Sequence, residues 1–445
     1  MSRPMEDFSP ETFRRRRDAI LAGLDGCAMV LPAAPVRISS RDTEYRYRPD
    51  SELFYVTGVA EPDAVAVLRG QEDDGPRFVL FVRSRDPAEE MWVGPRPGPE
   101  EAGELYGADV THSAKEMEER LPELLWGARR VHFRLGGSPR VERLVRQALE
   151  QARARGQRRG VGPRGVLDPG EVLDPLRRIK DQEEIRRLQR AADITAEAHR
   201  EAMARVRPGM GEWEIEALVD GTFRRLGADG PGFDTIVAAG SNGCFLHYTD
   251  NARTIAPGEL VLVDAGAALG LYTADVTRTF PAGGRFSPEQ RAVYEVVEAA
   301  REAAVARVAP GSDLAAVHDA AVAVLAEGLV ALGALDGSVE SLVSEEAHKA
   351  FFPHHTSHWL GLDVHDVGDY AQGDQPVPLA PGMVLTVEPG LYFPTDLEGP
   401  AARFAGVAVR IEDDVLVTGS GGRILGSGVP SHPDDVEALA GSRAS

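Results

Sequence analysis

Two stretches with the same pattern decide the fold: "PGELVLVDAG" (residues 257–266) and "PGMVLTVEPG" (residues 381–390). Each begins with Pro-Gly, continues as an apolar run typical of a buried strand, and ends with an acid close to a glycine. The acids, Asp264 and Glu388, occupy matching positions. A carboxylate in an apolar strand is unfavourable unless something compensates its charge. The repeat therefore raises the question of what stabilises two buried acids.

The sequence around these stretches repeats as well. "VRPGMGEWEIEALV" (206–219) and "VAPGSDLAAVHDAAV" (308–322) each predict the end of one helix, a Pro-Gly turn and the start of another helix. Each half then reaches its Pro-Gly, strand and acid pattern. We therefore expect two related halves, each made of helix, helix and strands.

The strands of the two halves supply four acids. In the first half, residues 259–280 predict two strands joined by a glycine-containing turn, with Asp264 on one strand and Asp275 on the other. In the second half, Glu388 and Glu412 take the corresponding positions. If a pseudo-two-fold axis relates the halves, the four carboxylates converge between them.

Four carboxylates in one poorly hydrated site need compensation. Desolvation and mutual repulsion would cost many kcal/mol or force the acids to bind protons. Divalent cations solve this problem, and carboxylate-rich sites suit ions such as Mn²⁺, often as a bridged pair in hydrolytic enzymes. A single acid at a strand end is more often a turn or capping residue. The prediction of a metal site therefore depends on four acids occurring in two equivalent strand patterns.

The segment "PHHTSHWLGLDVHDVG" (353–368) adds four histidines: His354, His355, His358 and His365. Their simplest interpretation is a solvated surface run. The flanking residues are apolar, however, so some of these imidazoles should be buried and need partners. One can ligate a metal, and others can donate hydrogen bonds to a carbonyl oxygen or an oxyanion. His247, in "NGCFLHYTDNART", is by itself weak evidence for a site.

Composition limits the partners. The chain has 445 residues, of which 43% are hydrophobic and 27% charged, enough for two or three domains of a soluble protein. Its net charge of -21 repels nucleic acid and anionic membranes and attracts a cationic amine. Cys27 and Cys244 offer neither a disulfide framework nor a thiolate metal site. We find no signal-peptide core and no apolar run that approaches the length of a membrane span, so we expect a cytoplasmic protein.

The chain divides near residue 175. Before it, a short helix at about residues 10–22 leads to strand-like runs that alternate with helical patterns, as in an α/β domain. The runs are 28–32, 52–58, 63–70, 77–85 and 129–135, and the helical patterns are 115–126 and 141–154. Residues 156–180 are rich in Gly, Pro and charge, which indicates a linker. Asp181 is the predicted N-cap of the helix that opens the second domain.

Together these motifs resemble those of the Xaa-Pro aminopeptidases (aminopeptidase P), a family of pita-bread metallopeptidases. The segments that carry the resemblance are 41–58, 242–253, 260–266, 272–281, 354–368, 385–393 and 406–418. The resemblance implies an α/β protein with a creatinase-like N-terminal domain (1–175) and a pita-bread catalytic domain (176–445). It also implies release of the N-terminal residue from peptides with proline in second position, at a site with two Mn²⁺ or other divalent ions.

Motif by motif, the resemblance implies roles for individual residues. The implied metal ligands are Asp264, Asp275, His358, Glu388 and Glu412. Among them, Asp275 and Glu412 would bridge both ions, Asp264 would hold one ion, and the remaining two ligands would hold the other. The residues implied to act on the substrate are His247, His354, His365, Glu388, Tyr392 and Arg410, the last of which would also pair with the carboxylates.

The sequence leaves the roles of two further residues, His355 and Trp92, open. The family more often has a glycine where this chain has His355, which leaves the role of that residue open. Trp92 is most simply an ordinary, partly buried aromatic side chain. The resemblance implies instead that it reaches from a neighbouring subunit, in a homodimer or homotetramer, to cover the proline pocket.

Other activities remain open at this point. An Xaa-Pro dipeptidase (prolidase) has the same fold and ligands but accepts only dipeptides, and the segments 45–58 and 357–359 favour the aminopeptidase. A metal-free relative, either creatinase-like or a peptide-binding module, is disfavoured because all five ligand positions are filled. A methionine aminopeptidase would lack the N-terminal domain.

Overall fold

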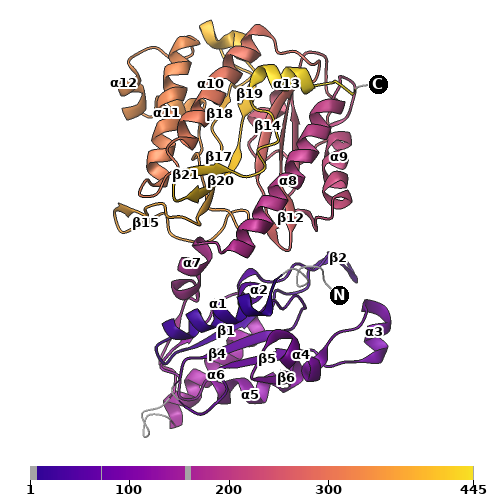
Figure 1. Cartoon of the computed structure of the whole chain (residues 1–445), viewed down its shortest axis with the longest axis vertical. Coiled ribbons are helices and arrows are strands. Elements are labelled where there is room, and N and C mark those ends of the chain that lie inside the picture. The colour runs from indigo at the N-terminus through magenta and orange to yellow at the C-terminus, as the bar shows by residue number, and fades with distance from the viewer. Residues whose placement is uncertain (1–7, 72, 156–161, 444–445) are drawn as a thin grey trace. The chain divides into compact units, whose positions relative to one another are not determined.

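The structure, a computed structural model, describes residues 8–71, 73–155 and 162–443. It separates into two compact units, Met1–Leu176 and Arg177–Ser445. In Figure 1 the first unit runs from indigo to purple and the second from magenta to yellow. Each unit has its own hydrophobic core. Part of the predicted linker, residues 156–161, lies outside the described residues.

Unit 1 is built on a six-stranded mixed sheet of order β6-β5-β4-β1-β7-β8 (Figure 1). Strand β1 (Ala28–Pro32) pairs antiparallel with β4 (Val65–Arg69) and parallel with β7 (Val131–His132). The central strands are buried along their whole length, as expected for a sheet covered on both faces. The remaining strands are β5 (Phe78–Val82), β6 (Val110–Ser113), β8 (Val166–Leu167) and the separate pair β2 (Ile38–Ser40) and β3 (Thr43–Glu44).

One predicted strand of unit 1 is a helix. Residues 52–58 were expected in a strand, but Asp50 accepts a hydrogen bond from the Leu53 amide at 2.8 Å and caps α2 (Ser51–Thr57). Gly58 ends this helix in the left-handed conformation. The residues of α2 are buried on all sides, which hides the helical period in the sequence. The other helices are α1 (Pro10–Gly23), α3 (Pro87–Val93), α4 (Gly98–Tyr106), η2 (Ala114–Glu116), α5 (Met117–Leu124) and α6 (Pro139–Arg155).

The predicted linker is partly helical. Residues Gly170–Arg178 form α7, which contains Pro175 and buries Leu173. The prediction of an irregular linker is therefore wrong over this segment. Tertiary burial of Leu173 outweighs the local signals of Gly and Pro.

The first half of unit 2 follows the predicted order. Asp181 caps α8 (Gln182–Arg205) through the amides of Glu183 and Glu184. After α9 (Glu212–Arg225), three strands form an antiparallel sheet: β10 (Ile236–Ala239), β11 (Leu260–Ala265) and β14 (Val276–Pro281). The smaller elements are β9 (Gly230–Pro231), η4 (Gly240–Cys244), β12 (Ala267–Leu269) and β13 (Tyr272–Thr273).

The second half repeats this order. Helices α10 (Pro288–Val305) and α11 (Leu314–Ala331) precede the antiparallel strands β17 (Val384–Val387), β20 (Asp413–Thr418) and β21 (Gly421–Ile424) (Figure 1). The predicted order of helix, helix and strands therefore occurs twice, and in each half the strands form a three-stranded sheet. The remaining elements are α12 (Val339–Ser344), η5 (Ala347–Ala350), β15 (Ala371–Gln372), β16 (Gln375–Pro376), β18 (Gly390–Tyr392), η6 (Gly399–Phe404), β19 (Ala408–Arg410) and α13 (Pro433–Leu439).

Helix α11 is mostly apolar, with His318, Asp319 and Glu327 as its titratable residues. Its 18 residues have a mean hydropathy of 1.7, so by length and composition it could cross a membrane. The prediction that no apolar run approaches this length is therefore wrong. The helix packs against α10, and Val322, Leu325 and Leu329 belong to the core of unit 2. In this structure 39% of the helix is buried, so burial accounts for part of its apolar character.

The hairpin predicted over residues 259–280 is bent. Strands β11 and β14 pair with each other, whereas β12 and β13, which lie between them in sequence, pair in a second sheet. A Cβ on Gly266 would lie only 1.6 Å from the carbonyl oxygen of Ala274, so only glycine permits the crossing. As a result, Asp264 lies inside β11, while Asp275 comes directly before β14.

Candidate metal centre

The two acids of the first half come from neighbouring positions of one sheet. Asp264 lies opposite Thr277 in the β11–β14 register, and Asp275 precedes Thr277 by two residues. Their side chains are 12% and 8% exposed. The prediction that Asp275 lies within a strand is wrong by one residue, because β14 begins at Val276.

The two acids of the second half also lie where strands end. Glu388 directly follows β17, and its amide donates to the carbonyl oxygen of Thr356 at 2.8 Å. Glu412 lies between β19 and β20. Its amide donates to the Thr277 carbonyl oxygen at 3.0 Å, and its Oε2 accepts a hydrogen bond from Thr277 Oγ1 at 2.6 Å. Thr277 therefore ties an acid of the second half to a strand of the first.

The predicted ligands converge. Oxygen and nitrogen atoms of Asp275, His358 and Glu412 all lie within 4.8 Å of one another. His358 Nε2 lies 3.4 Å from Asp275 Oδ2 and 3.7 Å from Glu388 Oε1. The negative charge of Asp264 raises the pKa values of Asp275, Glu388 and Glu412, because it lies close to all three. All five predicted ligands thus belong to one cluster.

Without a cation, this cluster holds protons. Burial and repulsion from neighbouring carboxylates raise the pKa values of Asp275 and Glu412 well above their usual range. Burial raises the pKa of Glu388 to about 7, although His358 and Arg410 oppose the change. At neutral pH the acids therefore share protons unless a positive charge replaces them.

Arg410 is the cation that touches this cluster directly. Its guanidinium donates to Asp264 Oδ2 at 2.7 Å, to Thr277 Oγ1 at 3.2 Å and to the hydroxyl of Tyr392 at 3.1 Å. The other oxygen of Asp264, Oδ1, is buried and has no hydrogen-bond partner within the part of the chain that the structure describes. A buried oxygen of this kind is suited to a metal ion.

Three predicted histidines lie around the cluster. His354 is bonded through Nε2 to the Tyr392 hydroxyl at 2.9 Å, and burial together with the Arg410 charge lowers its pKa to about 3. His354 is therefore neutral. The ring of His365 lies 4.5 Å from that of His358. A charge on His247 would lower the pKa of both His354 and His365, so the three imidazoles face one region.

His355 has a local role through its backbone. Its carbonyl oxygen is bonded to Nδ1 of His354 at 2.8 Å, and its ring lies 5.4 Å from that of His318. His318 in turn contacts Thr356 Oγ1 through Nδ1 at 2.8 Å. The loop is thus held by a histidine of α11 that the sequence did not identify.

Two further residues of the cluster were missed. Thr277 follows Asp275 by two residues, and Asp414 follows Glu412 by two. The carboxylate of Asp414 accepts hydrogen bonds from the Asp275 amide at 3.1 and 3.2 Å. This spacing puts each residue on the same strand face as an acid, a signal that could have identified both.

Trp92 is not a core residue. It lies on α3 of unit 1 with 86% of its surface exposed, beside Met91 and Val93, which are 81% and 70% exposed. The interpretation as a partly buried aromatic is therefore wrong. Three consecutive exposed apolar side chains form a surface patch, here called the α3 patch.

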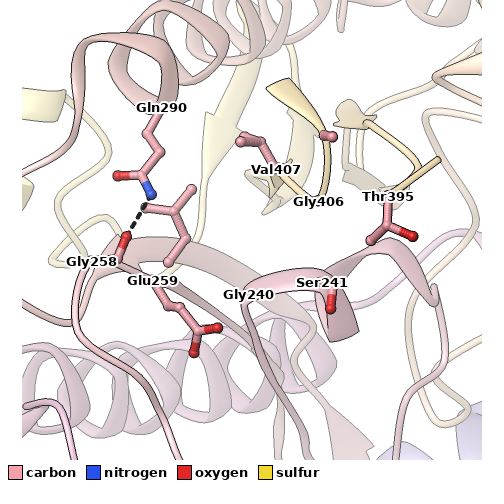
Figure 2. A pocket seen from close by; sticks show the side chains of 10 residues that line it. Gly240, Ser241, Gly258, Glu259, Gln290, Thr395, Gly406 and Val407 are labelled. Atoms are coloured by element: carbon pink, nitrogen blue, oxygen red, sulfur yellow. Dashed lines mark hydrogen bonds between the residues drawn. The ribbon is translucent and has the colours of Figure 1, made fainter. Parts of the chain in front are cut away.

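A cavity of about 300 Å³ lies between the start of β11, the start of α10 and the loop before β19 (Figure 2). Glu259 and Leu260 at the start of β11 line it, and Gln290 closes one side with a hydrogen bond to the Gly258 carbonyl oxygen at 2.8 Å. Asp264 lies four residues further along the strand, about 13 Å away. The predicted site residues do not line this cavity, which is therefore separate from the candidate metal centre.

Comparison with known proteins gives matches over both units. The profile of metallopeptidase family M24 matches residues 186–419, and that of the aminopeptidase P N-terminal domain matches residues 13–132. The Xaa-Pro aminopeptidase of Escherichia coli (strain K12) is 42% identical over 436 residues, which cover 98% of this chain and 98% of that protein.

Solved structures match the fold of this chain over nearly its whole length. The Pseudomonas aeruginosa aminopeptidase PepP has a TM-score of 0.94 and 42% identity, covering 97% of this chain and 98% of that chain. The zinc-substituted E. coli aminopeptidase P in complex with product has a TM-score of 0.93 and 42% identity, with the same coverage. Family membership and the clustered ligands support a divalent metal cofactor. The chain therefore belongs to metallopeptidase family M24 and, within it, to the Xaa-Pro aminopeptidases (aminopeptidase P) with their creatinase-like and pita-bread domains.

Proposed function

We propose that the chain is a metallo-aminopeptidase that releases the N-terminal residue from peptides with proline in second position. The observation that carries the proposal is the convergence of Asp275, His358 and Glu412, with Glu388 and Asp264 beside them. Clustered carboxylates with an imidazole are the ligand set of hydrolytic metal centres. Proteins named Xaa-Pro aminopeptidase that match nearly the whole chain support the substrate class.

We assign two divalent ions to the cluster, Mn²⁺ or other divalent ions. The residues that would hold the ions are Asp264, Asp275, His358, Glu388 and Glu412. The buried Oδ1 of Asp264 and the acids that would otherwise bind protons support this assignment. Bound ions would polarise the scissile carbonyl and lower the pKa of a water molecule.

The surrounding side chains would then handle protons and orient the substrate. Glu388 would take a proton from the attacking water and pass it to the proline nitrogen, which leaves only as an amine. His354 is neutral and donates its Nδ1–H to the His355 carbonyl oxygen, so its Nε2 accepts a hydrogen bond from the Tyr392 hydroxyl and would orient that side chain toward the substrate. His365 or His247 would stabilise the oxyanion.

The acids would also fix the cleavage position. A free α-amino group is attracted to clustered carboxylates, which places the first peptide bond at the reacting centre. Proline has no N–H, so a site with an apolar wall and no hydrogen-bond acceptor at that point favours it.

A peptide-length assay with metal analysis tests the proposal. Purified protein is loaded with Mn²⁺ or Zn²⁺, its metal content is measured, and it is given Xaa-Pro and Xaa-Pro-Xaa peptides. We expect release of the first residue from the longer peptides and about two ions per chain in the active form. Cleavage of Xaa-Pro dipeptides alone would identify a prolidase instead, and cleavage without metal would refute the metal assignment.

We further propose a homo-oligomer, dimer or tetramer, in the cytoplasm, with residues 1–175 and 176–445 as its two domains. The two compact units support this division. The α3 patch supports the oligomer, because a second copy of the chain would bury its three apolar side chains. Sedimentation velocity of the native protein and of Trp92→Ala tests the oligomer, since loss of the patch should shift the distribution toward monomer.

A further inference from the structure

His365 has no side-chain anchor of its own. Its surface is exposed, and within the described ranges no hydrogen bond joins its imidazole to another group. Among the described residues, the one aromatic ring that its imidazole contacts is that of His358. An imidazole that faces the substrate must nevertheless be held within about 0.5 Å of its productive position. Its position must therefore come from the backbone of its loop.

That backbone is fixed by the next residue, Asp366. The Asp366 amide donates to the Trp359 carbonyl oxygen at 2.9 Å. Its carboxylate accepts a hydrogen bond from Arg177 at 2.6 Å and lies 3.0 Å from the ammonium of Lys180. The three side chains are at most 2% exposed. Both oxygens of Asp366 are thus engaged by buried cations.

Arg177 also holds the other end of the loop. Its Nη2 donates to Asp363 at 2.8 Å as well as to Asp366, so one nitrogen connects the residues three positions apart that flank Val364 and His365. The Asp366 carboxylate packs closely against Gly361, since a Cβ on that glycine would lie 2.2 Å from its Oδ2. Two positive and two negative charges balance in this group, here called the Asp366 cluster.

We infer that Asp366 is a positioning residue for His365, acting through the Asp366 cluster. This inference rests on the proposed function, in which His365 faces the substrate. Burial of an ion pair is a poor source of net stability, because desolvation offsets the attraction. The cluster instead gives the loop one defined conformation, which sets the direction of the imidazole.

A double-mutant cycle tests this assignment. We expect Asp366→Asn to lower kcat about 10- to 100-fold on an Xaa-Pro-Xaa peptide, the cost of misplacing a reacting group by about 1 Å. In the His365→Ala background the same change should alter kcat by no more than about twofold, because the residue it positions is already absent. Equal losses in both backgrounds would overturn the inference, since a general structural defect adds to any other defect.

Two further variants distinguish a specific effect on His365 from a loss of folding. Arg177→Met removes the charge and both hydrogen bonds, so it should show the same non-additivity with His365→Ala even if Asp366→Asn does not fold. Asp369→Asn is the matched control, because it makes the same change at an exposed acid of the same loop and should leave kcat within about twofold of wild type. A loss in Asp369→Asn as large as in Asp366→Asn would contradict the assignment.

A crystal structure of Asp366→Asn gives a readout that does not depend on activity. The ring of His365 should lie farther from that of His358 than the 4.5 Å of the native chain, with the metal ligands unmoved. An unchanged His365 would overturn the inference. If instead the wild type cleaves no Xaa-Pro-Xaa peptide, the proposed function fails, and this displacement alone decides whether Asp366 positions the ring.

Discussion

Removal of the metal should make the stability of the chain depend on pH in a defined direction. In the metal-free protein, burial raises the pKa of Glu388 from 4.5 to about 7. An acid with a raised folded pKa contributes stability below its unfolded value, and this contribution is lost as the pH rises through the folded value. The metal-free protein should therefore lose stability between about pH 4.5 and pH 7.

The size of this effect follows from the pKa change. At about 1.4 kcal/mol per unit, the shift of Glu388 is worth about 3 kcal/mol. This figure is an upper value, because 18% of the side chain is exposed and water weakens the effect. Asp275 and Glu412, whose pKa values are also raised, act in the same direction. Bound metal replaces the protons and removes the dependence.

Urea unfolding of chelated protein at pH 5 and pH 8 measures the effect, with Trp359, fully buried in unit 2, as a fluorescence reporter. Glu388→Gln is the control, since the amide has nearly the same shape but does not titrate. Between the two pH values the wild type should lose up to about 3 kcal/mol more of its free energy of unfolding than the variant. Equal losses in the two proteins, both confirmed metal-free, would refute the reasoning.

Three substitutions test the separate roles. Asp275→Asn keeps the shape of the side chain but removes a charge shared by the ions, so metal affinity and turnover should fall together by more than about 100-fold. This loss exceeds the 10- to 100-fold, roughly, that follows when a residue that only hydrogen-bonds to a metal ligand is removed. Full activity with two ions retained, measured by elemental analysis, would contradict the ligand assignment. His354→Ala should leave the metal content unchanged while kcat falls roughly 10- to 100-fold, because the Tyr392 hydroxyl loses the partner that orients it; a parallel loss of metal would instead make His354 a ligand. Trp92→Ala should raise KM for proline peptides about tenfold while lowering the thermal midpoint much less, because the side chain is 86% exposed on its own chain; an unchanged KM would remove Trp92 from the substrate site.

Much of the metal centre could be predicted because its signals are local in sequence. Asp264 and Glu388 each follow an apolar run after Pro-Gly, and this repeat alone indicates two strands that deliver acids to one place. The helix cap at Asp181 was equally clear, because a side chain bonds to amides two and three residues away. Such features need no knowledge of the rest of the fold.

Features that depend on distant contacts could not be predicted. Asp366 looks like any loop acid until Arg177, 189 residues away, is brought beside it. The helix α2 is buried on all sides, so its sequence has no helical period and was interpreted as a strand. The bend at Gly266 depends on the carbonyl of Ala274 in the returning strand. In each case the deciding partner is supplied by tertiary structure.

The repeated halves of unit 2 bear on how such a site can arise. A symmetric dimer of the first half would bring together two copies of Asp264 and of Asp275, with only carboxylates as ligands. A dimer of the second half would bring two copies each of His358, Glu388 and Glu412. Neither arrangement has the single imidazole among four acids that the joined chain possesses. Fusion of the halves into one polypeptide is therefore what allows the two sides of the centre to differ, because each half can then be altered independently by mutation.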